Sequence, residues 1–183
     1  MKGSISRLWQ TCRVIANENR LRFLWLIFTN PNQCVGDLAK AIGITPATAS
    51  NQLKILCDEG FISAHRSRQQ VRYNAEFQDA PSHILHLQAA LKKSCHDAIP
   101  FHTIIHQATG FTHQRRIELL RKIASASVSL NELAEQTVIS YPALNRHLVK
   151  LEARNYITLN NGRYTLSKSK EPLPKALSKI IIC

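Results

Sequence analysis

The feature that most constrains the fold of this chain is a likeness between its two halves. Shifting the sequence by 95 residues aligns Arg20–Ile62 with Arg115–Ile157 without a gap. Seven of the eight identical pairs are apolar and recur at helical spacing, which is typical of a shared core. The sequence therefore predicts two copies of one small folded unit. The identical pairs are Arg20/Arg115, Leu24/Leu119, Leu38/Leu133, Ala39/Ala134, Ile44/Ile139, Leu53/Leu148, Leu56/Leu151 and Ile62/Ile157.

The local signals predict the same elements in each copy. In the first, Gly43 permits a turn, Thr45 caps the next helix and Pro46 takes its first position. In the second, Ser140 caps the third helix and Asn161-Gly162 predicts a tight hairpin. Helix, helix, turn, helix and hairpin is the order of a winged helix-turn-helix. The expected helices are 20–29, 35–42, 46–58, 114–124, 130–137 and 141–153, and the expected strands are 61–64, 71–75, 156–159 and 163–166, with a basic turn at 65–70.

Apolar stripes outside these units predict flanking helices near residues 5–15, 81–97, 101–108 and 174–182. They would pack the two units into a pseudo-dimer, unless each helix covers only its own domain. The expected fold class is mainly α with small β-hairpin wings. The expected domains are residues 1–99 and 100–183, each one winged-helix unit with its flanking helices.

Charge and composition narrow the class of partner. The 183 residues carry a formal net charge of +12, which suits a polyanion such as nucleic acid, while 44% hydrophobic residues exclude a disordered basic tail. The two predicted domains share the charge, at +5 and +7. No apolar run approaches the ~20 residues of a spanning helix, and no signal peptide is evident, so a cytoplasmic protein without membrane contact is expected.

The motifs resemble those of the ArsR-type winged-helix repressors. The resemblance rests on TCRVIANENRLRFLWLIF, CVGDLAKAIGITPATASNQLKILCDEGFI and VRYNA in the first copy, and more weakly on RRIELLRKIA, SLNELAEQTVISYPALNRHLVKLEARNYI and GRYTL in the second. It implies dimerisation through the first and last helices, with recognition helices in adjacent major grooves. Because both copies lie in one polypeptide, we expect a fused, asymmetric dimer, monomeric as a chain, whose half-sites lie about one turn, ~10 bp, apart.

The expected partner is double-stranded DNA, contacted by the third helix and the wing of each unit. Asn and Gln side chains suit adenine, Arg suits guanine, and a cationic wing follows the backbone or the minor groove. Each of these polar residues could instead be part of a solvated helix face. The candidates are Thr45, Pro46, Thr48, Ser50, Asn51, Gln52, Lys54, Arg66, Arg68 and Arg72 in the first unit, and Tyr141, Asn145, Arg146, His147, Lys150 and Arg163 in the second.

The resemblance also raises the question of a sensor site. Metal-sensing relatives carry a Cys-x-Cys pair before the second short helix, whereas this chain has Gly36 two residues after Cys34, so no metal and no cofactor is expected there. Two other sites are weaker candidates: imidazoles at His83, His86, His102 and His106 for a metal, and a reversible disulfide between Cys12 and Cys95. Solvated histidines and a core cysteine are the plainer interpretations.

No phosphate loop, nucleophile elbow or carboxylate pair supports catalysis, so the chain is not expected to be an enzyme. The sequence favours a transcription repressor that binds an imperfect inverted repeat. Two alternatives remain open: a tandem winged-helix module for protein interaction or chromosome organisation, and a nonspecific architectural DNA binder. The first predicts exposed apolar stripes on the recognition helices, and the second predicts steep salt dependence with little sequence preference.

Overall fold

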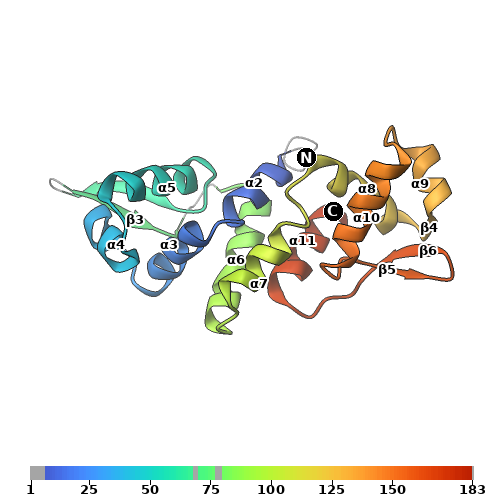
Figure 1. Cartoon of the computed structure of the whole chain (residues 1–183). Coiled ribbons are helices and arrows are strands. Elements are labelled where there is room, and N and C mark those ends of the chain that lie inside the picture. Colours follow the sequence, from blue (N-terminus) through green and yellow to red (C-terminus); the bar gives the residue numbers. More distant parts are fainter. Residues whose placement is uncertain (1–6, 68–69, 77–79, 183) are drawn as a thin grey trace. The chain divides into compact units, whose positions relative to one another are not determined.

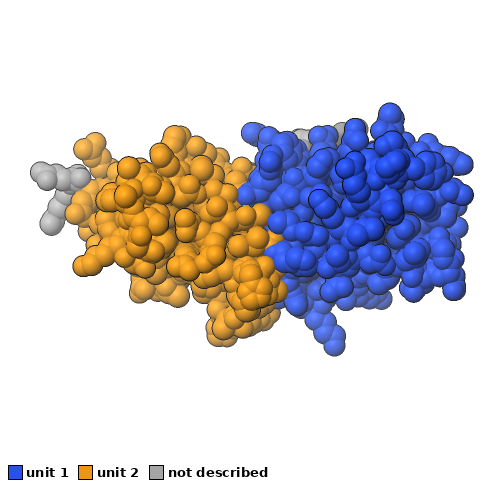
Figure 2. Space-filling view, in the orientation of Figure 1, with its two compact units in different colours: residues 1–13, 106–183 blue, residues 14–105 orange. Residues whose placement is uncertain are grey.

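The computed structural model describes residues 7–67, 70–76 and 80–182 (Figure 1). The chain forms two compact units, which Figure 2 colours separately. Unit 2 is residues 14–105, and unit 1 combines residues 1–13 with residues 106–183. The unit boundaries fall inside two helices, α2 (Leu8–Ile15) and α7 (Phe101–Ala108). The units differ from the expected domains, 1–99 and 100–183, mainly because the N-terminal segment groups with the second half of the chain.

The two units have the same order of elements, helix, short strand, two helices and two strands, followed by one more helix. Each unit contains a three-stranded antiparallel sheet with its last strand in the centre, in the orders β1-β3-β2 and β4-β6-β5. The described chain is thus mainly helical with small sheets, as predicted. Unit 2 contains α3 (Glu18–Thr29), β1 (Gln33–Cys34), α4 (Val35–Ile42), α5 (Pro46–Asp58), β2 (Ser63–Ser67), β3 (Gln70–Asn74) and α6 (Ser82–His96). Unit 1 contains α8 (Gln114–Ser125), β4 (Val128–Ser129), α9 (Leu130–Gln136), α10 (Tyr141–Glu152), β5 (Ile157–Asn160), β6 (Arg163–Leu166) and α11 (Pro172–Ile182).

Local chemistry explains where the helices and turns begin and end. The Thr45 hydroxyl accepts a hydrogen bond from the Thr48 backbone N–H and so caps α5, as expected. Gly43 ends α4 at φ +80°, a left-handed conformation that glycine adopts without strain. Asn161 and Gly162 both have positive φ, which confirms the predicted tight hairpin. Ser140 occupies the N-cap of α10 without a side-chain hydrogen bond to the helix, so its capping role is weaker than expected.

The first wing differs from its expected form. His65, Arg66 and Ser67 lie in strand β2 rather than in a turn, whereas Phe61 and Ile62 are buried before the strand starts. The ladder extends to the pair Ser67↔Gln70, so strand pairing takes up most of the stretch that was expected to form a turn. Strands β1 and β4 were not predicted. Two residues are too few for an alternating pattern, and only pairing with β3 and β6 makes them strands.

The structure also corrects the gapless alignment of the two halves. The N-caps of α3 and α8, Asn17 and His113, share the same backbone angles and lie 96 residues apart. Between the start of α4 and the end of α5 the offset is 95, because residues 30–32 connect α3 to β1 while only two residues, 126–127, connect α8 to β4. Arg20 therefore corresponds to Arg116 and Leu24 to Leu120, so the expected pairs Arg20/Arg115 and Leu24/Leu119 were wrong. The buried positions agree: Leu21, Phe23, Leu24 and Ile27 match Ile117, Leu119, Leu120 and Ile123.

An aromatic contact closes the core of unit 1. Tyr156 is almost fully buried, packs edge-on against Phe111 with ring centroids 4.8 Å apart, and donates its hydroxyl hydrogen to the Gln107 carbonyl at 2.9 Å. Its ring also covers Gly110, where a Cβ would lie 2.4 Å from Cε2. Glycine is thus required at position 110 by close approach. The contact joins the segment that leaves α7 to the strand region that follows α10.

We expect Gly110→Ala to destabilise the protein by about 1–3 kcal/mol, because the rigid Tyr156 ring must move to admit the methyl group. Urea-induced unfolding followed by circular dichroism measures the change. Gly36→Ala is the matched control: a Cβ at position 36, inside α4, meets its nearest neighbour, Cys34 Sγ, at 3.8 Å. That variant should gain roughly 0.5–1 kcal/mol from reduced backbone freedom. Equal stability of the two variants would contradict the proposed close packing.

Candidate nucleic-acid interface

The N-cap and the N-terminal half of α5 present half of the DNA-binding candidates of unit 2. Thr45, Pro46, Thr48, Ser50 and Asn51 are all exposed, while Ala49 and Leu53 on the opposite face are fully buried. The Thr45 and Thr48 hydroxyl groups lie 2.9 Å apart and share a hydrogen bond, so the cap already engages both. Ser50 and Asn51 extend from the open face of the helix. Hydroxyl and amide groups of this kind can read base edges in a major groove.

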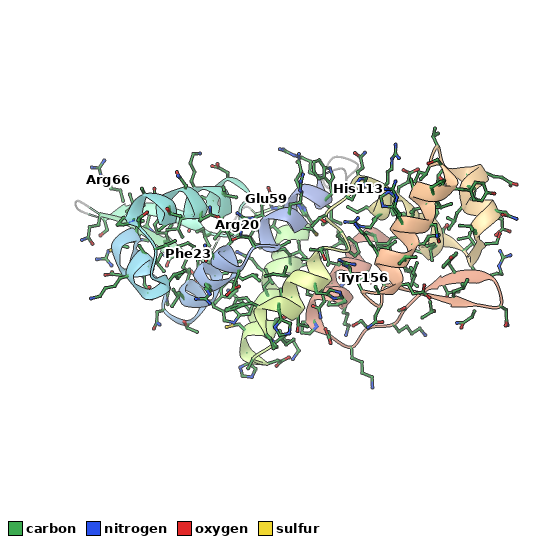
Figure 3. All side chains as sticks on the ribbon, in the orientation of Figure 1. Arg20, Phe23, Glu59, Arg66, His113 and Tyr156 are labelled. Atoms are coloured by element: carbon green, nitrogen blue, oxygen red, sulfur yellow. The ribbon has the colours of Figure 1, made fainter. Side chains whose placement is uncertain are left out.

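Gln52 has a structural role that the sequence did not predict. It is half-buried, and its Oε1 accepts a hydrogen bond from Arg20 Nη1 at 2.8 Å. The Nε of the same guanidinium donates to the Val14 carbonyl at 2.5 Å (Figure 3). Arg20 thereby links α3, the segment before it and the middle of α5. Its burial lowers the pKa of Arg20, but a guanidinium keeps its charge at any physiological pH.

Lys54, in the C-terminal half of α5, forms an ion pair with Asp58, with Nζ 2.9 Å from Oδ2. The hydrogen bond to Asp58 and the charge of that carboxylate raise the pKa of Lys54. Both side chains are exposed, so the pair adds little stability. Lys54 can leave Asp58 for a phosphate at small cost.

The recognition-helix candidates of unit 1 fall on different faces of α10. Asn145, Arg146 and Lys150 are exposed, and Arg146 Nε contacts the Pro142 carbonyl of its own helix at 3.3 Å. Tyr141 is 52% exposed, and its hydroxyl donates to Asn131 Oδ1 on α9 at 3.2 Å. Arg146 and Asn145 have the guanidinium and amide groups that pair with guanine and adenine.

His147 belongs to a contact within unit 1 that no sequence signal indicated. Its ring centroid lies 4.7 Å from that of His113, the N-cap residue of α8, whose Nδ1 accepts from the Arg115 backbone N–H. Burial and nearby positive groups lower the pKa of His147 to about 4, and the same causes lower the pKa of His113. The positive groups that act on both are Arg115, Arg116 and Lys150. The two rings are thus neutral near pH 7 and pack together without repulsion.

A second arginine contact holds the loop beside this pair. Arg116 is buried, and its Nε donates to the Gly110 carbonyl at 2.8 Å while Nη2 donates to the Thr109 carbonyl at 2.7 Å. Arg154, just after α10, donates to the Thr109 hydroxyl and to the Lys150 carbonyl. The 109–113 loop is therefore tied both to α8 and to the end of α10. The position of Arg116 near the start of its helix was the one sequence signal for this role. The gapless alignment paired Arg20 with Arg115 instead and so did not draw attention to Arg116.

Of the described arginines on the wings, one is exposed and two form hydrogen bonds or ion pairs with other parts of their unit. Arg66 is exposed on β2 (Figure 3), whereas Arg72 Nη1 donates to the Asn32 carbonyl at 2.7 Å. Arg163 donates to the Ser127 carbonyl at 2.6 Å and forms an ion pair with Glu132 at 3.0 Å. Arg72 and Arg163 thus connect the central strand to the chain before the second helix of each unit. Arg68 lies outside the described residues.

The sensor candidates do not gather into a site. Among the described residues, no three His, Cys, Asp or Glu side chains are placed to hold a metal ion. His86, His102 and His106 are exposed, and burial lowers the pKa of the half-buried His83. Cys12 is fully buried in unit 1, while Cys95 is half-buried in unit 2. The Cys34 thiol contacts Asp37 at 3.1 Å.

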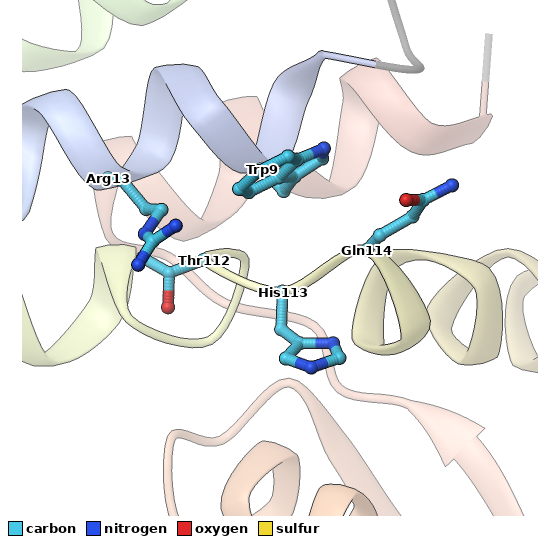
Figure 4. Close-up of a pocket in the computed structure, with 5 residues that line it drawn as sticks. All are labelled: Trp9, Arg13, Thr112, His113 and Gln114. Atoms are coloured by element: carbon cyan, nitrogen blue, oxygen red, sulfur yellow. The ribbon is translucent and has the colours of Figure 1, made fainter. Parts of the chain in front are cut away.

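Unit 1 also contains an open pocket of about 310 Å³ (Figure 4). Trp9 and Arg13 reach it from α2, with the Arg13 guanidinium 5.5 Å from the Trp9 ring centre. Thr112, His113 and Gln114 form the other wall. The imidazole of His113 turns from this wall to the side on which it meets His147. The pocket therefore offers an indole, a guanidinium, a hydroxyl and an amide next to the loop that contacts α10.

A comparison with known protein families finds a similarity within unit 2. Residues 16–70 match the model of the MarR family. The matched stretch runs from the start of α3 through α5 and β2. It supports a winged-helix regulator of transcription that binds DNA, and MarR proteins are regulators rather than enzymes. The finer ArsR resemblance stays a prediction. In the part of the chain that the structure describes, no helix is long and apolar enough to span a bilayer.

We expect the stability of unit 1 to fall between about pH 6.5 and pH 4, through His147. The unfolded chain binds a proton on this imidazole near its ordinary pKa of about 6.5, whereas the folded chain resists it down to about 4. His147→Gln removes the imidazole and places in α10 the residue type that α5 has at its own seventh position. The urea midpoint of this variant should therefore fall less on acidification than that of the wild type. His86→Gln, on the exposed face of α6, is the control and should follow the wild type.

Proposed function

We propose that the chain is a transcriptional repressor that binds an imperfect inverted repeat through α5 and α10, both carried by one polypeptide. The observation that carries the proposal is the shared geometry of the two units. Each has a helix at the same place in the same order of elements, with one face buried and polar residues on the other. Each half of the chain, 1–99 and 100–183, supplies one such helix. The common element order and sheet order support an origin by duplication, and hence a pseudo-dimer that acts as one chain.

The charges of the units agree with this function and refine it. Unit 1 contains 15 Lys and Arg against 5 Asp and Glu, a balance of +10, whereas unit 2 contains 9 against 7, a balance of +2. Residues 1–13 carry three positive and no negative side chains, so their grouping with the second half accounts for the whole difference from the expected +5 and +7. Unit 1 would supply most of the long-range attraction to DNA, which depends on charge and not on sequence.

The wings indicate that the two half-sites are bound unequally. Beyond the pair that contains Tyr73, the first wing has three further cross-strand pairs, while beyond the pair that contains Tyr164 the second has one. Arg66 lies on the longer wing, and the cation of the shorter wing, Arg163, is engaged by Glu132. A longer wing with an open cation reaches more of the backbone. The target would therefore be an imperfect repeat.

One observation favours a second candidate function, a module for protein interaction. Val138, in the turn before α10, is 99% exposed, and Val149 on α10 is 55% exposed. Large exposed apolar groups often mark protein-binding surfaces. On α5, by contrast, the position that corresponds to Val149 carries the charged Lys54. A protein module would bind no particular duplex, and selection from random DNA separates the two functions.

Selection with the full chain should enrich duplexes with two unequal half-sites about one turn apart, and their affinity should fall with salt.

Asn51→Ala and Arg146→Ala should each lose discrimination at particular base pairs, by about 1–3 kcal/mol. Arg66→Ala should weaken all duplexes alike and reduce the salt slope by about one. Lys93→Ala, on α6 and paired with Asp97, is the charge-matched control and should leave base preference unchanged. Binding without any enriched sequence would overturn the proposal.

A further inference from the structure

The open face of α10 contains an apolar pair that the proposed function leaves unexplained. Tyr141, Asn145 and Val149 are spaced four residues apart, so they lie on one face of the helix. Tyr141 is 52% and Val149 is 55% exposed, and Asn145 between them is exposed as well. Two large apolar groups thus flank an amide on a strip of the helix surface that lies about 90° around the axis from the face of Leu144, Leu148 and Leu151, which are fully buried.

Helix α5 does not have this pattern. The first, fifth and ninth residues of α10 are Tyr141, Asn145 and Val149, and those of α5 are Pro46, Ser50 and Lys54. Lys54 is charged and paired with Asp58, and Ser50 has no apolar surface to offer. The apolar pair is therefore a property of unit 1 and not a general feature of the two units.

The Tyr141 ring is held rather than free. Its hydroxyl donates to Asn131 Oδ1 at 3.2 Å, and Asn131 is on α9. The ring is thereby fixed at the N-terminal end of α10, the part of a recognition helix that contacts base edges. A pre-positioned ring loses little conformational freedom when a partner covers it.

Charges next to this face fit duplex DNA as the partner. Arg146 and Lys150 follow Asn145 and Val149 in sequence and are both exposed, whereas the acidic residue of α10, Glu152, stands at its last position. Cations beside an apolar strip match phosphates beside base edges. In the major groove, thymine is the base that presents a methyl group, and apolar side chains contact it.

We propose that Tyr141 and Val149 read two thymine methyl groups in one half-site, on either side of an adenine read by Asn145. Eight residues of helix span about 12 Å. Base pairs follow one another at about 3.4 Å, so the two methyl groups lie three to four base-pair steps apart. This inference rests on the proposed function, because it assumes that α10 enters the groove, and it adds the chemistry that α10 recognises.

The test replaces each thymine in turn by deoxyuridine, which removes only the C5 methyl, in a duplex enriched by the full chain. The wild type should lose about fourfold in affinity, the worth of one buried methyl, at two positions in one half-site only. Val149→Ala should abolish the effect at one position, and Tyr141→Ala at the other. Tyr141→Phe, which keeps the ring and loses only the hydrogen bond to Asn131, should retain it. Leu85→Ala, an exposed leucine on α6, is the control and should behave as the wild type.

The possible results separate this inference from the function on which it rests. If no duplex is enriched, both fail together. If a duplex is enriched but every thymine tolerates deoxyuridine, or if the sensitive positions persist in the Val149→Ala and Tyr141→Ala variants, the inference fails and the proposed function stands. Sedimentation of the free chain provides the remaining result. If the wild type self-associates and Val149→Ala does not, the apolar face binds a second copy, and the inference is overturned.

Discussion

An arginine at the start of the first helix of each unit, half-buried as Arg20 in unit 2 and buried as Arg116 in unit 1, positions the helices α5 and α10. Arg20 Nε donates to the Val14 carbonyl and Arg116 Nε donates to the Gly110 carbonyl, the same relative position in both units. A buried guanidinium must find acceptors for its N–H groups, so it orders the chain before the helix. Arg20 also donates a hydrogen bond to Gln52 on α5. Arg116 is linked to α10 through Thr109, whose carbonyl accepts from Arg116 and whose hydroxyl accepts from Arg154, just after α10. The orientation of both helices follows from these contacts together with the apolar core.

The same demand for partners divides the polar residues of the candidate interface into two groups. Gln52, Arg72 and Arg163 use their side chains to hold helices and strands together. Ser50, Asn51, Asn145 and Arg146 lie on open helix faces. A count of basic and polar residues near a recognition helix therefore overstates the number that can contact DNA. The groups that the fold engages contribute instead to the position of the groups that are open.

Most of the secondary structure could be predicted, because its signals are local. Thr45 and Pro46 start α5, Gly43 ends α4, and Asn161-Gly162 makes the second hairpin, each through chemistry within a few residues. The candidate site was harder. The exposed α5 face was anticipated, but the His113–His147 contact and the role of Gln52 were not. In each of these pairs the two residues are more than thirty positions apart, and nothing in either neighbourhood marks its partner.

The sequence by itself determined most of the helices, the cap at Thr45 and the tight hairpin at Asn161-Gly162, since these depend on short-range backbone preferences and on apolar periodicity. Only the tertiary structure decided that residues 1–13 group with residues 106–183 and that α3 and α8 correspond at an offset of 96. It also decided which cations stay open for a ligand. The physical reason is the same in each case. Buried polar groups and core side chains contact residues that are close in space but distant in sequence. The one-residue difference between the two connections can therefore be located only from these contacts.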